Sequence, residues 1–395
     1  MDPTPLTYRL FAVCSPGLER FVGRELGHLG LLPRPSPANP SAEGEPGTEE
    51  AGGIEFEGSL PDIYRTNLHV RTASRVLVRL GAFHAVLFPE LRRKASHLPW
   101  QDYLTPGQPV ALRVTCHQSR LYHQKAVAER VAGAIDDRLG KPSPVQKLDG
   151  EGLQSPPQLI IVRLVENQCT ISVDSSGALL HRRGYRLATA RAPLRETVAA
   201  SMLLASGWDT LSPLLDPFCG SGTIAIEATL LAMKIPAGRA RRFAFMDWPN
   251  LDEQTWRKLL KDSDVLPPLS PPTILASDRD AGAVRAAQAN AERAGVASMI
   301  RFSRRAFSAI EPPPSPGWII TNPPFGVRVS PDEELRNLYG QLGKILRLKC
   351  VGWRVAILCN AVHLLRHTGL PFGEMISLVN GGLRVILALG RIASR

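Results

Sequence analysis

The sequence predicts an α/β protein built in two parts, with a parallel sheet and crossover helices from about residue 178 onward and an α+β module before it. Three observations predict this fold class. Short apolar strands alternate with helices in the C-terminal half. A turn containing Gly220 and Gly222 joins one of these strands to a helix, and Asn380-Gly381 stands between two β-rich runs near the end of the chain.

The half before residue 178 mixes strands and helices and lacks a Gly-rich phosphate loop. In chain order we expect a strand at 8–13, a helix from 18 to 26, a helix and then a strand within 63–80, a strand at 109–115, a helix at 125–139 and two strands within 158–173. Residues 33–53 are rich in Pro, Gly, Ser and Glu and show no apolar periodicity. We therefore expect a flexible surface loop there.

The strands of the C-terminal half are short and apolar, as burial of both faces of a parallel sheet requires. We expect them at 214–216, 273–277, 318–321 and 353–359. Pro-rich segments mark the loops that enter the second and third of these strands. The chain then closes with an antiparallel hairpin, because strand-like runs at 375–379 and 383–389 flank the Asn380-Gly381 turn.

Composition restricts the class of protein and of partner. The 395 residues carry 47 Lys and Arg against 36 Asp and Glu, a net charge of +11 that favours a polyanionic partner such as nucleic acid. The six cysteines form no CxxC pair, and no His cluster has metal-ligand spacing. No signal-peptide pattern and no apolar run of membrane-spanning length occurs. We expect a soluble cytoplasmic protein, monomeric by default, without a metal and without a membrane contact.

The segment from Asp216 to Thr223 is the first candidate binding site, since it lies between a buried strand and an apolar helix. Gly220 and Gly222 allow a sharp turn and a close approach of the backbone to a ligand. The segment matches neither the Walker loop nor the GxGxxG fingerprint, and the acid ahead of the turn points to a cationic ligand such as the ammonium of a methionine moiety. The alternative is a tight strand-helix turn in which Asp216 caps the helix.

A second acid follows the next strand of the C-terminal half. Asp278 stands where a carboxylate would accept both hydroxyls of a ribose, although the segment 236–272 makes its spacing from the glycines longer than usual. The alternative role of Asp278 is to cap the helix 281–294.

The third candidate site is the tetrad Asn322-Pro323-Pro324-Phe325, which follows the third strand of this half. The two prolines fix an extended backbone and remove donors, so bare carbonyls stand beside an amide and an aromatic ring. The Asn322 side-chain oxygen and the Pro323 carbonyl would accept two hydrogen bonds from an amino group on a flat ring, and Phe325 would stack on that ring. The pattern therefore predicts positioning of an exocyclic amino group; an ordinary Asn-Pro-Pro turn is the alternative.

The segments Asp216 to Thr223 and Asn322 to Phe325 together resemble the class I S-adenosylmethionine-dependent amino-methyltransferases. Further resemblance, to the THUMP-domain RNA guanine-N2 methyltransferases, is carried by residues 180–186, 192–197, 338–343, 71–76 and 98–100. It spans nearly the whole chain. It implies a Rossmann-like catalytic domain at 178–395 with a seven-stranded sheet and a closing antiparallel hairpin. Before it would stand a ferredoxin-like subdomain at 1–60 and a THUMP-like RNA-binding domain at 61–177.

The resemblance also implies roles for individual residues. S-adenosylmethionine would be bound by Asp216, Phe218, Gly220, Gly222, Thr223 and Asp278, and the catalytic group would be Asn322, Pro323, Pro324 and Phe325. The product would be N2-methylguanosine in large-subunit ribosomal RNA or in tRNA. In one departure from the family, Ala306 stands at the place expected for the acid that reads the adenine amino group. Two alternatives keep the enzyme class and change the substrate, to adenine in DNA or glutamine in protein. A third alternative is a non-catalytic RNA-binding role.

A run of arginines precedes the cofactor segment. Between residues 178 and 195 stand Arg182, Arg183, Arg186, Arg191 and Arg195, without an acid among them. Such a run is often a solvated face, but at a domain junction ahead of a nucleotide site it favours contact with RNA phosphates. We expect Arg182, Arg183, Arg186 and Arg191 to bind RNA.

Overall fold

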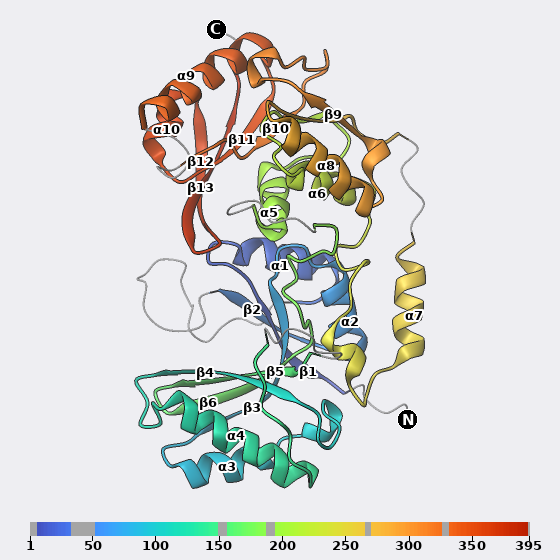
Figure 1. Ribbon diagram of the computed structural model, residues 1–395, viewed down its shortest axis with the longest axis vertical. Coiled ribbons are helices and arrows are strands. Elements are labelled where there is room, and N and C mark those ends of the chain that lie inside the picture. The colour runs from blue at the N-terminus through green and yellow to red at the C-terminus, as the bar shows by residue number, and fades with distance from the viewer. Residues whose placement is uncertain are drawn as a thin grey trace.

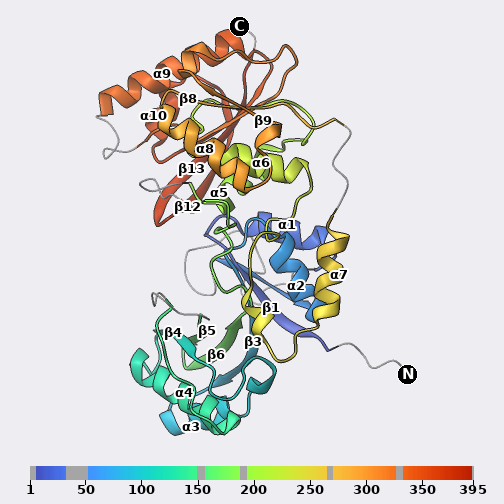
Figure 2. The same ribbon diagram turned by 45° about the vertical axis from the view of Figure 1, so that its right-hand side comes forward.

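The computed structural model describes residues 6–32, 52–148, 156–186, 194–264, 270–325 and 332–393. It forms an elongated molecule in which the C-terminal half, with the C-terminus, lies at one end and the N-terminal half at the other (Figure 1; Figure 2). Most of the loop expected at 33–53 lies outside the described residues. Its last residue, Gly53, is already the first residue of a strand.

The N-terminal half is built on one six-stranded sheet with the order β2-β1-β3-β6-β5-β4. The strands are β1 (Tyr8–Val13), β2 (Gly53–Gly58), β3 (Arg75–His84), β4 (Val110–His117), β5 (Gln158–Val165) and β6 (Gln168–Asp174). The helices are α1 (Glu19–His28), α2 (Leu60–His69), α3 (Phe88–Ser96), α4 (Gln124–Leu139) and the short η1 (Trp100–Asp102).

Strand β3 makes this sheet continuous. Its first residues pair with β1, and most of its length pairs with β6, both in antiparallel register. The six strands therefore form a single sheet, although family resemblance divides this half into two modules. The boundaries expected at residues 60 and 177 remain predictions.

The C-terminal half contains a seven-stranded sheet with the order β12-β13-β11-β10-β7-β8-β9. The strands are β7 (Leu214–Asp216), β8 (Ile274–Asp278), β9 (Ile300–Arg304), β10 (Trp318–Thr321), β11 (Arg354–Cys359), β12 (Phe372–Asn380) and β13 (Leu383–Arg391). The helices are α5 (Glu196–Ser206), α6 (Thr223–Ala232), α7 (Glu253–Asp262), α8 (Ala281–Arg293), α9 (Asp332–Lys349), α10 (Val362–His367), and the short η2 (Ala244–Asp247), η3 (Ala297–Met299) and η4 (Phe307–Ala309). In the sheet, the neighbouring strands β9, β8, β7, β10 and β11 run parallel to one another, and β13 runs antiparallel to β11. The predicted architecture is therefore confirmed.

The closing hairpin is present, with its turn one residue later than predicted. Asn380 pairs with Leu383 as the last residue of β12, and the turn consists of Gly381 and Gly382. Both glycines have positive φ, at 59° and 88°, which a side chain tolerates poorly. Two glycines therefore occupy the two turn positions, and Asn380 remains in the strand. Its side-chain oxygen accepts a hydrogen bond from the Arg195 backbone N–H at 3.3 Å.

Residues 236–264, which we call the strap, leave the sheet of the C-terminal half after α6 and pack on the N-terminal half before the chain returns to β8. Helix α7 of the strap lies beside α2 (Figure 1; Figure 2). The Tyr64 ring of α2 stacks on Phe245 with ring centroids 4.6 Å apart and meets Trp256 edge-on at 6.1 Å. The Trp248 indole donates to the Gln158 side chain of β5 at 2.8 Å. The strap thus contributes an aromatic core to the half that precedes it.

Within the described residues, no helix is both long enough and apolar enough to span a membrane.

Replacing Trp256 by Ala tests the packing of the strap. The indole is 7% exposed and contacts aromatic rings of the strap and of α2, so its loss should lower the free energy of unfolding by about 3–5 kcal/mol. Urea unfolding followed by fluorescence measures the change. Leu211→Ala, at a side chain that is 70% exposed, is the control and should change stability by less than about 0.5 kcal/mol. Equal effects of the two variants would contradict the packing described here.

Candidate active site

The three segments singled out in the C-terminal half meet at one edge of its sheet. Asp216 ends β7, Asp278 ends β8 and Asn322 directly follows β10. Strand β7 pairs in parallel with β8 on one side and with β10 on the other, so the carboxyl ends of all three strands are neighbours. This edge is where ligands bind in open parallel sheets.

Asp216 is buried and only partly satisfied. Its Oδ1 accepts hydrogen bonds from the Thr321 hydroxyl at 2.7 Å and from the Phe218 backbone at 3.2 Å, whereas its buried Oδ2 has no partner. Burial raises the pKa of the Asp216 carboxyl to about 7, although the two hydrogen bonds lower it. The capping alternative is wrong, because Gly222 occupies the N-cap of α6. The free Oδ2 can receive a donor such as an ammonium group.

The two glycines of the loop have different roles. Gly220 has a φ of +51° and no atom within 4 Å of the place where a Cβ would stand, which leaves room for a ligand. Gly222 has a φ of +83°, and a Cβ there would lie 2.9 Å from the Cβ of Ala287 on α8. Gly222 therefore allows the loop to pack against α8, and the Asn290 amide of the same helix donates to the Ser221 carbonyl at 2.9 Å.

Asp278 links the end of β8 to the loop. Its Oδ2 accepts a hydrogen bond from the Gly220 backbone and its Oδ1 accepts one from the Asp280 backbone, each at 3.0 Å. The capping alternative is wrong here too, because the Asp280 side chain caps α8 by accepting from Gly282 and Ala283. Each carboxylate oxygen of Asp278 keeps a lone pair, so ribose hydroxyls can still donate to it.

Phe218 and Thr223, at the two ends of the loop, contact different parts of the protein. The Phe218 ring lies against Phe307 of η4, with centroids 5.2 Å apart. Thr223 is buried, and its hydroxyl accepts a hydrogen bond from Arg186 at 2.6 Å, so any role in ligand binding would act through the shape of the loop. Ala306 is the N-cap of η4, just beyond the end of β9, and offers no polar side chain. This part of the site therefore presents the rings of Phe218 and Phe307 beside the apolar Ala306.

The tetrad Asn322 to Phe325 directly follows β10 and contains a buried polar atom without a hydrogen-bond partner. The side-chain oxygen Oδ1 of Asn322 is buried and has no hydrogen-bond partner. Pro323 is buried, Pro324 is exposed, and the half-buried Phe325 ring packs against both apolar cores of the protein. An unpartnered buried acceptor costs free energy unless a ligand supplies the donor, so the tetrad is suited to binding a group that donates.

The arginine run is placed differently from the prediction. Arg182 is exposed, as phosphate contact requires, and Arg191 lies outside the described residues. Arg183 is 4% exposed and meets Glu227, and Arg186 is nearly as buried and meets Glu196, so neither has the surface for an RNA contact. We therefore withdraw the phosphate role for these two. Sequence analysis missed Glu227, although a single acid in the otherwise apolar α6 is a recognisable signal.

Among the residues that the structure covers, no group of three or more His, Cys, Asp and Glu side chains could hold a metal ion.

Three family models match the chain in succession. The model described as "RlmL ferredoxin-like domain" matches residues 9–77, the THUMP domain model matches residues 87–174, and the model described as "RMKL-like, methyltransferase domain" matches residues 183–385.

Curated relatives match almost the whole chain. A protein of Synechocystis sp. named "Putative RNA methyltransferase slr0064" is 33% identical over 376 residues, which cover 94% of each chain. The "Ribosomal RNA large subunit methyltransferase K/L" of Syntrophotalea carbinolica is 33% identical over 95% of this chain but only 52% of its own length. The chain thus spans about half of this K/L relative.

A solved structure has the same fold throughout. The crystal structure of SMU.472, described as "a putative methyltransferase complexed with SAH", superposes with a TM-score of 0.85 at 27% identity and covers 99% of this chain and 100% of its own. SAH is S-adenosylhomocysteine, the demethylated form of the cofactor. The chain therefore belongs to the RMKL-like methyltransferase family, whose members use S-adenosylmethionine, and it carries the family's RlmL ferredoxin-like and THUMP domains.

Proposed function

We propose that this enzyme transfers a methyl group from S-adenosylmethionine to the exocyclic N2 of a guanosine in structured RNA. Large-subunit ribosomal RNA is the first candidate substrate and tRNA the second. The observation that carries the proposal is the buried, unpartnered Oδ1 of Asn322, next to the Thr321 hydroxyl that holds Asp216. A guanine amino group supplies the donor that this oxygen lacks.

The residues at the strand ends fit the cofactor. The free Oδ2 of Asp216 would accept from the ammonium of the methionine moiety, Asp278 would accept from the ribose hydroxyls, and the open space beside Gly220 would admit the ligand. Phe218 and Phe307 would offer ring faces to the adenine in place of an acid. When bound, S-adenosylmethionine supplies a methyl group on a positively charged sulfur.

The tetrad positions the amino group for attack. With Asn322 Oδ1 and the Pro323 carbonyl accepting its two N–H bonds, the nitrogen lone pair points away from them, and Phe325 holds the base by stacking. The N–C bond forms as the C–S bond breaks, and the surplus proton leaves the nitrogen for solvent afterward, so the tetrad needs no titratable base. Positioning and polarisation therefore provide the catalysis.

The RNA substrate is favoured by the N-terminal half and by the relatives. A THUMP domain stands before the catalytic domain, and the relative from Syntrophotalea carbinolica is named for ribosomal RNA of the large subunit. A guanosine that is unpaired, or flipped out of its helix, would reach the tetrad. Exposed Arg182 remains a candidate phosphate contact, as does Arg191. We infer further that the enzyme acts in the cytoplasm as a monomer without a metal ion.

Tritium transfer from labelled S-adenosylmethionine to total RNA tests this function. Nucleoside chromatography should find the label in N2-methylguanosine, and the size of the labelled RNA should identify ribosomal RNA or tRNA. Parallel reactions with duplex DNA and with protein test the two other amino-methyl acceptors. Label in N6-methyladenine or methylglutamine, with none in RNA, would replace the proposed substrate.

Replacing Asn322 by Ala removes the side-chain acceptor of the amino group. The kcat should fall by about a hundredfold or more, whereas the affinity for S-adenosylhomocysteine should change little, because Asn322 lies on the substrate side. Single-turnover methyl transfer and calorimetry measure the two quantities. A variant that kept full activity would show that Asn322 does not position the reacting group.

Cofactor affinity should depend on pH through Asp216. Because its raised pKa is about 7, the carboxyl is protonated below that value and must lose a proton before it can bind an ammonium. The Kd for S-adenosylhomocysteine should therefore rise by up to about tenfold per unit as pH falls below about 7, and level off above it. Calorimetry across this range measures the slope. Asp216→Asn should bind weakly with a flat profile, and a flat profile in the wild type would contradict the assignment.

A further inference from the structure

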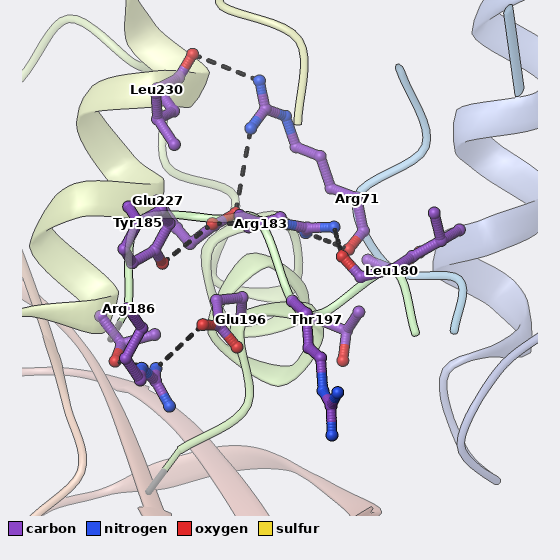
Figure 3. Close-up of polar contacts among 12 residues, drawn as sticks. Arg71, Leu180, Arg183, Tyr185, Arg186, Glu196, Thr197, Glu227 and Leu230 are labelled. Atoms are coloured by element: carbon purple, nitrogen blue, oxygen red, sulfur yellow. Dashed lines mark hydrogen bonds and ion pairs between the residues drawn. The ribbon is translucent and has the colours of Figure 1, made fainter. Parts of the chain in front are cut away.

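A buried group of charged side chains joins the N-terminal half to α6, the helix that begins at the cofactor loop. We call Arg71, Arg183, Arg186 and Glu227 the α6 clamp (Figure 3). Arg71 belongs to the N-terminal half, whereas Arg183 and Arg186 belong to the segment that connects this half with the catalytic domain. Glu227 belongs to α6.

Glu227 is 1% exposed and lies at the centre of the clamp. Arg183 donates to both of its carboxylate oxygens, with each N–O distance 3.4 Å, and the Tyr185 hydroxyl donates to Oε1 at 3.2 Å. The Arg71 guanidinium approaches Oε2 at 3.9 Å. One carboxylate on α6 therefore meets cations from two other parts of the chain.

Arg71 also holds the end of α6 that lies away from the cofactor. Its guanidinium donates to the carbonyls of Leu230 and Ile235, which places a positive charge at the C-terminal end of the helix. The Arg71 backbone is itself held within the N-terminal half, because its N–H donates to Glu25 of α1 at 2.8 Å. Its carbonyl accepts from Arg183 at 2.5 Å, so the connecting segment and the N-terminal half are bonded to each other as well.

Arg186 holds the opposite end of α6, at the cofactor loop. It donates to the hydroxyl of Thr223, the first residue of the helix, at 2.6 Å, and to the Leu194 carbonyl at 2.9 Å. It also pairs with the buried Glu196 at 3.3 Å. Thr223 and Glu227 are four residues apart and therefore share one face of α6. The connecting segment runs along this face and bonds it at both positions.

Burial alone does not account for a charge at this position. Glu227 is the only charged residue of α6, whose sequence is TIAIEATLLA, and an apolar residue would be buried there at lower cost. A buried ion pair rarely adds net stability over apolar packing, and in some proteins it instead fixes how the paired elements are placed. The clamp is therefore suited to setting the position of α6 against the N-terminal half.

We propose that Arg71, Arg183 and Arg186 are positioning residues for the cofactor loop, so that cofactor affinity depends on the docking of the N-terminal half. This inference rests on the cofactor-binding role of the loop given above. Gly222 is the N-cap of α6, so a displacement of the helix displaces the loop residues that Asp278 and α8 hold from the other side. Arg71 makes no hydrogen bond or ion pair with residues 216–223, so its effect on the cofactor passes through α6.

The test is the affinity of full-length variants for S-adenosylhomocysteine, measured by calorimetry. Arg71→Met should raise Kd by about tenfold or more, and Arg71→Lys, which keeps the charge but not the fork of donors, should raise it less. In methyl-transfer assays the KM for S-adenosylmethionine should rise while kcat at saturation stays within about twofold. Arg257→Met, which breaks an exposed ion pair with Glu253, is the matched control and should leave Kd unchanged.

A destabilised variant outside the clamp separates positioning from general loss of stability. Leu91→Ala removes a buried side chain of α3, on the far part of the N-terminal half, and should lower the thermal unfolding temperature without changing Kd. If Arg71→Met and Arg71→Lys bind with the wild-type Kd, the inference is overturned. It is overturned equally if Leu91→Ala weakens binding as much as Arg71→Met does. Failure of the wild type to bind would instead count against the cofactor site itself.

Discussion

The hydrogen bond from the Thr321 hydroxyl to Asp216, at 2.7 Å, ties the end of β10 to the end of β7. This bond occupies Oδ1 of the buried Asp216 carboxyl and leaves Oδ2 without a partner. Thr321 also immediately precedes Asn322, the first residue of the tetrad. A second bond, from the Gly220 backbone to Asp278, ties the loop to the end of β8. Two hydrogen bonds thus hold the proposed cofactor side and the proposed substrate side of the site in one geometry, which is the arrangement that catalysis by positioning requires.

The sheet of the catalytic domain was predictable because its strands obey one physical rule. Strands buried on both faces, such as 318–321, are apolar except for the terminal Thr321 and stand out from their surroundings. The N-terminal half was harder to predict. In β2 the single fully buried residue is Phe56, so this short segment carries little apolar pattern. In α3 the buried Leu91 and Ala95 do stand at helical spacing, but they are the only fully buried residues of the helix, and it was not predicted from the sequence. The position of β2 depends on its pairing with β1, which is distant in the sequence, and α3 packs against α4.

The candidate site was predictable to the extent that it depends on parallel strands. Asp216, Asp278 and Asn322 each follow a predicted strand, and adjacent strand ends bring them together. The role of the arginines was not predictable in the same way. Charge in a linear sequence says nothing about burial, and the acids that neutralise Arg183 and Arg186 stand in helices α6 and α5, beyond the run itself. Only the fold reveals that Arg183 and Arg186 lie inside the protein.

The strap has a consequence for synthesis of the protein. The ring of Tyr64 and the side chain of Gln158 are covered by Phe245, Trp256 and Trp248, which the ribosome adds roughly ninety residues or more after each of them. A nascent chain that ends before the strap therefore leaves an apolar face of its N-terminal half exposed to water. The N-terminal half cannot reach its final core on its own, and a truncated product would present a surface that chaperones and proteases recognise.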